Sequence, residues 1–109
     1  MAKEITAKDL HERLSRGEPT LLLDVRKDWE FELGALPGAV HLVLDELHDR
    51  AQEIVEPTDP RLIVTVCHHG VRSLHAAMIL QSLGYANVLS LAGGTDVWSR
   101  MIDPSLARY

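Results

Sequence analysis

Cysteine and aromatic residues are scarce in this chain of 109 residues. The sequence contains a single cysteine, Cys67, and only 5% of its residues are aromatic. One cysteine excludes an internal disulfide, a metal site built from several cysteines, and a second thiol in the chain that could resolve an oxidised Cys67. Any chemistry of this thiol therefore depends on its local surroundings and on molecules that come from outside the chain.

Long apolar runs and an excess of positive charge are also absent. No apolar stretch approaches the roughly 20 residues that a membrane-spanning helix needs. The first residues lead into a polar helical pattern and lack the features of a signal peptide. The net charge of −5 argues against nucleic acid as a partner. We therefore expect a cytoplasmic protein in a reducing compartment, with no membrane or nucleic-acid partner.

What remains is the composition of an ordinary globular domain. Hydrophobic residues make up 46% of the chain and charged residues 25%, which is typical of one folded domain over residues 1–109. A chain of this length can bury a core without metals or disulfides. Both tryptophans, Trp29 and Trp98, lie at helical spacing among apolar neighbours, so we expect both in the core.

Hydrophobic periodicity predicts strands that alternate with helices. Apolar runs predict strands over residues 20–25, 40–42, 62–66 and 87–91. Helical spacing predicts helices over about 6–16, 28–33, 45–56, 73–83 and 97–102. Such alternation indicates a parallel sheet with helices on both faces. The sequence shows no internal repeat and no linker, so one α/β unit is expected.

Three of the predicted strands end in polar or glycine-rich residues. Cys67 follows one strand, Asp24-Val25-Arg26 ends another, and Gly93-Gly94 follows the last. Ligands bind at the carboxyl ends of strands in parallel sheets, so the three ends predict one site. The side chains of Asp24 and Arg26 are two residues apart on a strand, so they point to the same face of the sheet. They are either a solvated surface pair or a brace for a neighbouring loop, and the sequence does not separate these alternatives.

The stretch from Cys67 to Arg72 is expected to form a break between a buried strand and a helix that starts at about Ser73. If residues 68–72 curl around the helix start, their N–H groups and the helix dipole favour negative charge there. Such a position favours the nucleophilic thiolate. Arg72 adds a planar cation that matches an oxyanion, and Gly70 suits a turn with positive φ. A buried structural cysteine is the alternative, but Gly70 and Arg72 favour a nucleophile.

Three histidines lie close to Cys67 in the sequence, namely His68, His69 and His75. Together with Cys67 they form one candidate zinc set. Adjacent residues in a tight loop rarely aim at a single ion, so we expect no metal. Another interpretation is that one histidine tunes the thiolate or meets an acceptor. We expect the ring of His68 to face solvent and leave the role of His69 open.

Taken together and in this order, these segments resemble the rhodanese-like sulfurtransferases. The similar residues are Leu22–Arg26, Glu30–Phe31, Gly34, Pro37–Ala39, Cys67–Ser73, Leu91–Gly94 and Trp98. The resemblance implies a three-layer α/β fold with a five-stranded, mostly parallel sheet and helices on both faces. It also implies a very short first strand near Glu4 and Ile5. Ala35 departs from the pattern, since many relatives carry histidine there, at a position that reads as structural.

The resemblance also implies roles for individual residues. Cys67 would carry the transferred sulfur as a persulfide, and Asp24 with Arg26 would brace the site. The substrate-binding loop would comprise His68, His69, Gly70, Val71, Arg72 and Ser73. Related phosphatases have five residues between the cysteine and the arginine, whereas this chain has four. The shorter loop indicates a sulfurtransferase, because a smaller pocket suits a sulfur atom better than a phosphate.

The expected activity is transfer of a sulfane sulfur from a donor such as thiosulfate to cyanide or an acceptor thiol. No metal or organic cofactor is required for this chemistry. Two alternatives remain open at this stage. The protein could be a sulfur-relay partner that exchanges sulfur with another protein, or a non-catalytic docking module of the same fold.

Overall fold

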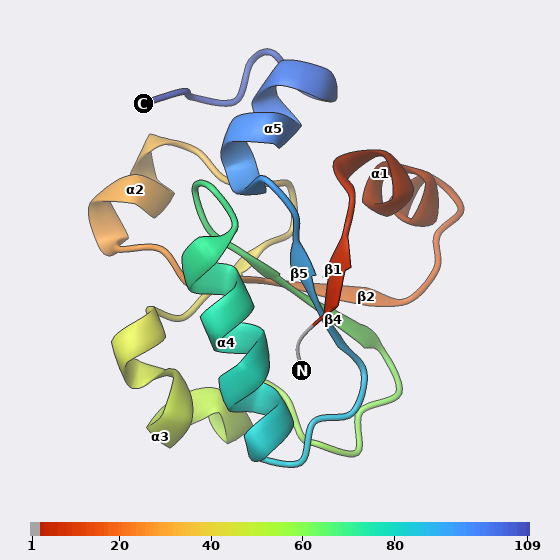
Figure 1. Ribbon diagram of the computed structural model, residues 1–109, viewed down its shortest axis with the longest axis vertical. Helices are drawn as coiled ribbons and strands as arrows, with labels where there is room; N and C mark the ends of the chain where they lie inside the picture. Colours follow the sequence, from red (N-terminus) through yellow and green to blue (C-terminus); the bar gives the residue numbers. More distant parts are fainter. Residues whose placement is uncertain (1–2) are drawn as a thin grey trace.

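The computed structural model describes residues 3–109, in which five strands alternate with five helices (Figure 1). The strands are β1 (Lys3–Ile5), β2 (Thr20–Asp24), β3 (Val40–His41), β4 (Leu62–Val66) and β5 (Val88–Leu91). The helices are α1 (Ala7–Ser15), α2 (Asp28–Leu33), α3 (Leu44–Ile54), α4 (Val71–Ser82) and α5 (Gly94–Met101). None of these helices, all within residues 3–109, is long and apolar enough to cross a membrane. The alternation confirms the predicted α/β class.

All five strands belong to one sheet with the order β1-β5-β4-β2-β3. Every neighbouring pair among them is parallel, so the sheet is parallel throughout and not only for the most part. The short strand β1 pairs with β5 at one edge, with Ile5 opposite Leu91. β4, which leads to Cys67, lies in the middle of the sheet and is therefore paired on both sides.

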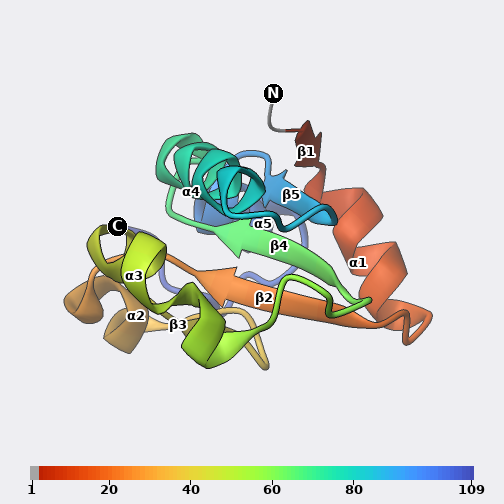
Figure 2. The same cartoon turned by 90° about the horizontal axis from the view of Figure 1, so that it is seen from below.

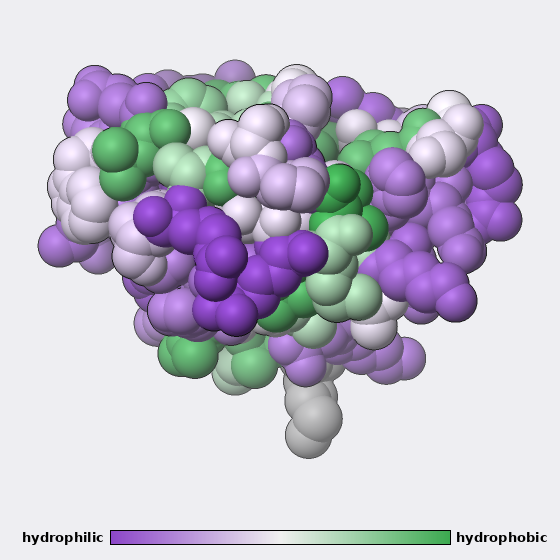
Figure 3. Space-filling model, turned by 90° about the horizontal axis from the view of Figure 1, so that it is seen from above, coloured by the Kyte–Doolittle hydropathy of each residue, from purple (hydrophilic) through white to green (hydrophobic). Residues whose placement is uncertain are grey.

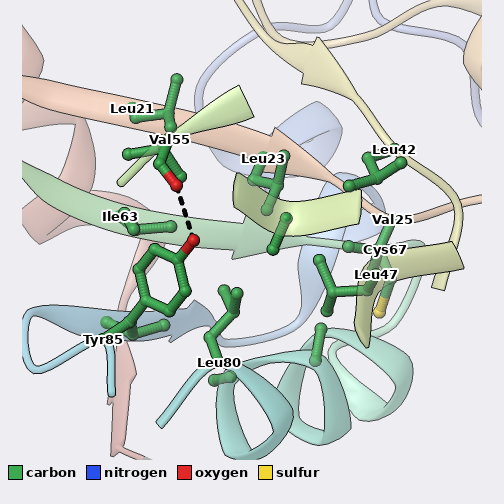
Figure 4. Close-up of a cluster of buried hydrophobic side chains, with 14 residues drawn as sticks. Leu21, Leu23, Val25, Leu42, Leu47, Val55, Ile63, Cys67, Leu80 and Tyr85 are labelled. Carbon is green, nitrogen blue, oxygen red and sulfur yellow. Dashed lines mark hydrogen bonds between the residues drawn. The ribbon is translucent and has the colours of Figure 1, made fainter. Parts of the chain in front are cut away.

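The helices cover the two faces of the sheet (Figure 2). Successive strand side chains point to opposite faces, so Leu21 and Leu23 join one core cluster and Leu22 joins the other. The first cluster lies under α3 and α4 and includes Leu47 and Leu80 (Figure 4). The second lies under α1 and α5. These two cores on either side of a rigid sheet fix the positions of the strand ends.

The two tryptophans have different environments. Trp98 on α5 is 4% exposed, as predicted, but Trp29 on α2 is 56% exposed, so the core prediction for Trp29 was wrong. The helix α2 is only six residues long, and the single side chain that it buries is Glu30. Successive residues of a helix point about 100° apart, so Trp29 faces outward when Glu30 faces inward.

Two helices begin earlier than the periodicity predicts. α4 starts at Val71 and not at Ser73, and α5 starts directly at Gly94. In both cases a glycine with positive φ makes the turn before the helix: Gly70 at +98° and Gly93 at +75°. Because glycine adopts these angles without strain, the chain reverses within fewer residues than the pattern suggests.

Figure 3 shows the molecule from above, which is the side where α5 and the C-terminal segment lie in Figure 1. On this face apolar side chains stand in separate groups among strongly hydrophilic ones. Met101 of α5 is one of the large apolar side chains that stay exposed, at 64%. The polar surroundings break the apolar surface of this face into small areas.

Candidate active site

Three strand ends meet around Cys67, as predicted. The backbone N–H of Val25, just after β2, donates to the carbonyl oxygen of Val66 over 2.9 Å. The backbone N–H of Thr95, after β5, donates to the carbonyl oxygen of Cys67 over 2.8 Å. Figure 4 shows the sulfur of Cys67 at the end of β4, directed toward the first turn of α4. The sheet therefore places the thiol at a helix N-terminus.

The turn between β4 and α4 is shorter than expected. The predicted break over residues 67–72 comprises only residues 67–70, because Val71 and Arg72 already belong to the first turn of α4. Gly70 has the predicted positive φ, at +98°. A Cβ at this position would lie 2.9 Å from the backbone nitrogen of Gly93, so the close approach of the two loops also requires glycine.

The Cys67 sulfur is held by backbone amides. Its Sγ accepts hydrogen bonds from the N–H of Gly70 over 3.1 Å and of Ser73 over 3.2 Å. The hydroxyl of Ser73 lies 3.4 Å from the sulfur and 2.7 Å from the hydroxyl of Ser90 on β5. N–H donors at a helix start favour a negatively charged acceptor. The cradle is thus built by the amides of Gly70 and Ser73, and both residues belong to the stretch His68–Ser73 that the resemblance indicated.

Cys67 and His68 are both buried, at 1% and 9% exposure, whereas His69 is exposed. The prediction that the His68 ring faces solvent was wrong. Its ring centroid lies 3.9 Å from that of His69, and also 3.9 Å from that of Tyr109, with the Tyr109 ring stacked at an interplanar angle of 12°. Burial lowers the pKa of His68, and the neighbouring His69 lowers it further. The stack on Tyr109 involves residues 41 positions apart, which no local pattern reveals.

Arg72 is paired with a carboxylate that the sequence did not identify as part of the site. Its Nη1 and Nη2 donate to Oε1 and Oε2 of Glu30 over 2.6 and 2.8 Å, which makes a bidentate ion pair. The hydrogen bonds from Arg72 are the main reason why the pKa of Glu30 falls to about 2. The same contact raises the pKa of Arg72. Two of the five guanidinium N–H groups therefore face α2.

Asp24 and Arg26 form a buried ion pair with an N–O distance of 2.8 Å. Their side chains are 0% and 1% exposed, so the alternative of a solvated surface pair was wrong. Arg26 also donates to the carbonyl oxygen of Gly34 over 2.7 Å. The pair therefore connects the end of β2 with the loop that follows α2.

Tyr109 is the second residue near the site that the sequence analysis missed. Its hydroxyl accepts a hydrogen bond from Nη1 of Arg26 over 2.9 Å and donates to Oε2 of Glu30 over 2.8 Å. Its ring stacks on His68 and meets the Trp29 ring edge-on at 5.6 Å between centroids. The C-terminal segment thus reaches both the charged residues and the histidine next to Cys67.

The candidate zinc set does not come together. His75 is exposed on α4, and within residues 3–109 no group of three or more histidine, cysteine, aspartate or glutamate side chains is placed to hold a metal ion. Cys67, His68 and His69 are neighbours in the chain, but the sulfur is directed to the backbone of Gly70 and Ser73.

A fully parallel sheet covered by helices and a cysteine whose sulfur accepts two backbone hydrogen bonds at a helix start define an α/β protein with a cysteine turn at the end of its central strand. The family model of the rhodanese-like domain matches residues 6–101. The chain belongs to the rhodanese-like family.

Relatives of the chain are sulfurtransferases. A sulfurtransferase of Allochromatium vinosum is 36% identical over 100 residues, which span 92% of this chain and 91% of the relative. The thiosulfate sulfurtransferase GlpE of Haemophilus influenzae is 35% identical over 98 residues, with 90% and 89% covered. The human single-domain sulfurtransferase TSTD1 has a similar structure, with a TM-score of 0.77, 28% identity, and 93% and 98% covered. These relatives support a rhodanese-type sulfurtransferase.

Proposed function

We propose that this protein transfers a sulfane sulfur from thiosulfate to cyanide or an acceptor thiol through a persulfide on Cys67. The observation that carries the proposal is the hydrogen bonding of the Cys67 sulfur by the amides of Gly70 and Ser73. Amides in this arrangement stabilise a thiolate before the reaction and a sulfur-centred charge during it. Relatives of similar length that are named sulfurtransferases give independent support.

In the first half-reaction the Cys67 thiolate attacks the outer sulfur of thiosulfate. The bond between Sγ and that sulfur forms while the sulfur–sulfur bond of the donor breaks, and its electron pair leaves with sulfite. The charge is balanced, because a thiolate and a thiosulfate dianion give a persulfide anion and a sulfite dianion. The step needs no oxidant, no metal and no proton transfer.

In the second half-reaction cyanide, or the thiolate of an acceptor, attacks the outer sulfur of the persulfide. The bond to Sγ breaks and its electron pair returns to Cys67, which regenerates the thiolate. The product is thiocyanate or the persulfide of the acceptor. Because the first product leaves before the acceptor reacts, ping-pong kinetics are expected.

Recognition of the donor is assigned to the loop His68–Ser73, and above all to Arg72. Thiosulfate is a dianion, and the guanidinium keeps N–H groups beyond the two that bind Glu30. The pairing with Glu30 fixes the direction of Arg72 before any donor arrives. Pre-orientation of this kind reduces the entropy lost on binding.

The burial of Cys67 sets a further condition on the reaction. Because the residue is only 1% exposed, a donor can reach the sulfur only when the turn 67–70 or the side chains over it move outward. The support for a sulfurtransferase over a phosphatase comes from the loop, which has four residues between Cys67 and Arg72, one fewer than in the related phosphatases.

Mass spectrometry tests the proposal directly. After incubation with thiosulfate, the intact protein should gain the mass of one sulfur atom, and peptide mapping should place it on Cys67. Cyanide should remove the added sulfur with formation of an equal amount of thiocyanate. A folded C67S variant should show neither event. If the wild-type protein gains no sulfur and forms no thiocyanate, the proposed transfer is refuted and the docking module is favoured.

A sulfur relay is the second candidate function. One relative is the putative sulfur carrier protein YrkF of Bacillus subtilis, which is 32% identical over 96 residues that span 88% of this chain and half of the relative. In a relay, Cys67 would take its sulfur from the persulfide of another protein. Loading by a protein persulfide but not by thiosulfate would support this candidate. A docking module has no need for the thiol, so the amide cradle around Cys67 argues against it.

A further inference from the structure

The C-terminal segment 102–109 lies beyond the residues 6–101 that match the rhodanese-like family model, yet it reaches the candidate active site. Leu106 is buried, at 7% exposure, in the same core cluster as Trp98. The hydroxyl of Ser99 on α5 donates to the carbonyl oxygen of Leu106 over 2.8 Å. From this anchor the chain runs back from α5 toward α2 (Figure 1). The path brings Tyr109 to the charged residues around Arg72.

The hydroxyl of Tyr109 takes part in fixing the Glu30 carboxylate. Glu30 accepts four hydrogen bonds: two from Arg72, one from the backbone N–H of Lys27 at 3.1 Å, and one from Tyr109 at 2.8 Å. The same hydroxyl accepts from Arg26 over 2.9 Å. Tyr109 therefore links the buried Arg26 to the ion pair that orients Arg72.

The ring of Tyr109 has a separate contact with the residue that follows Cys67. It stacks on His68 with 3.9 Å between centroids and an interplanar angle of 12°. Tyr109 itself remains 40% exposed, so its ring contributes little to the core. Tyr85, in contrast to Tyr109, is a core residue. It is 2% exposed, and its hydroxyl donates a hydrogen bond to the carbonyl oxygen of Val55.

We propose that Tyr109 is a positioning residue for sulfur transfer. Its hydroxyl holds Glu30, and through it the Arg72 guanidinium, in the orientation that recognises an anionic sulfur donor, while its ring keeps His68 packed beside Cys67. The inference rests on the proposed function and adds a residue from outside the family-matched region. Desolvation lowers the pKa of His68, which agrees with a neutral ring held under Tyr109.

Steady-state kinetics of Y109F test the role of the hydroxyl. This variant keeps the ring and loses both hydrogen bonds of the hydroxyl, the one to Glu30 and the one from Arg26, of which the first contacts the Glu30–Arg72 ion pair directly. We expect the KM for thiosulfate to rise by roughly three- to tenfold, the usual range for one such bond. The kcat should stay within about twofold, because the sulfur and its amide donors are unchanged. R108A is the matched control, since Arg108 is the exposed neighbour of Tyr109, and its KM should equal that of the wild type.

An NMR titration of His68 tests the role of the ring without reference to activity. In Y109A the titration midpoint of His68 should rise toward that of an ordinary histidine, because its ring is no longer covered. In Y109F, which keeps the stack, it should stay low. An unchanged KM in Y109F, a loss confined to kcat, a loss of folding in Y109F, or an unchanged His68 midpoint in Y109A would each overturn the proposal. If wild-type protein transfers no sulfur at all, the proposed function fails first, and the titration still reports on the Tyr109–His68 contact.

Discussion

The backbone N–H of Thr95 donates to the carbonyl oxygen of Cys67 over 2.8 Å, and this bond ties the start of α5 to the residue that carries the thiol. The next amide, that of Asp96, donates to the carbonyl oxygen of His68 over 3.0 Å. Two successive amides of α5 thus hold the first half of the cysteine turn. The contact requires a residue without a side chain at position 94, which explains the glycine there.

Substitution of Gly94 by alanine should displace the cysteine turn. Gly94 has a φ of +59°, and a Cβ would lie 2.2 Å from the Cys67 carbonyl oxygen. Backbone atoms on both sides cannot yield to relieve this overlap. We expect G94A to lower the free energy of unfolding by roughly 3 kcal/mol and to abolish most sulfur transfer. Urea unfolding and the thiocyanate assay measure the two effects.

The matched control for this variant is G17A. Gly17 also has a positive φ, at +70°, but a Cβ there would meet no atom within 4 Å. The cost should therefore be only the backbone strain, about 1–2 kcal/mol, with activity retained. Equal losses of activity in G94A and G17A would contradict the assigned role of the close approach at Gly94.

Glu30 should make stability depend on pH in the acid range. Its pKa is about 2 in the folded protein, against an ordinary value of 4.5. A carboxylate whose pKa is lower in the folded state stabilises the protein above its unfolded pKa, and this contribution is lost as the pH falls from 4.5 toward 2. The shift corresponds to about 3 kcal/mol for this buried group.

The E30Q variant isolates this contribution from those of other carboxylates. It should be about 3 kcal/mol less stable than the wild type near neutral pH. The difference should shrink as the pH falls, and nearly vanish at the acid end of the range. Urea unfolding of both proteins over a pH series gives the comparison. A gap between the two proteins that stays constant with pH would show that Glu30 is not the titrating group.

Asp24 and Asp59 allow a comparison of one motif in two environments. Each aspartate binds the arginine two residues later, and the N–O distances are 2.8 Å for Asp24–Arg26 and 2.9 Å for Asp59–Arg61. The first pair is fully buried, whereas the side chains of the second are 22% and 39% exposed. D24A leaves a buried cation unpaired and should cost about 3–5 kcal/mol.

D59A removes a solvent-screened pair and should lower the free energy of unfolding far less than D24A does. Chemical denaturation of both variants in the same buffer gives the two free energies of unfolding. Costs of similar size would mean that burial does not govern the strength of this motif in the protein.

Ser73 should assist the sulfur chemistry through its hydroxyl, which lies 3.4 Å from the Cys67 sulfur. S73A removes this group and keeps the backbone amide of residue 73, so the persulfide should still form, but roughly three- to tenfold more slowly. S90A removes only the hydroxyl that binds Ser73, so its effect should be smaller. Single-turnover loading with thiosulfate measures both rates, and a larger effect of S90A would contradict the direct role of Ser73.

The features that depend on residues close together in the sequence, such as the start of α1 and the turn at Gly70, could be predicted from the sequence. The first helix was predicted over about residues 6–16, and α1 begins there, with Thr6 as the N-cap that accepts a hydrogen bond from the backbone N–H of Asp9. Gly70 adopts the positive φ that its place in the turn suggests. The resemblance to rhodanese-like proteins added strand β1, which is too short and too exposed to produce a periodic pattern.

Contacts between distant residues escaped prediction. Glu30 and Arg72 are 42 residues apart, and their pairing follows from how α2 and α4 pack. The stack of Tyr109 on His68 likewise depends on where the C-terminal segment returns. Trp29 shows the reverse case: its apolar neighbours suggested burial, but the orientation of a short helix decided otherwise. Side-chain direction in these elements is set by tertiary packing.

The pairing of the first strand with the last has a consequence for synthesis of the protein. Lys3 lies opposite Leu89 in the sheet, and β5 also covers one edge of β4. A nascent chain that has not yet released residues 88–91 from the ribosome leaves the apolar strand β4 and the short strand β1 without this neighbour, and the unpaired edge of β4 is prone to aggregation. The hydrogen bond from the backbone N–H of Thr95 to the carbonyl oxygen of Cys67 can form only after translation has passed Thr95. Reactivity of the thiol toward sulfur donors should therefore arise only after the segment that contains Thr95 has emerged from the ribosome and joined the fold.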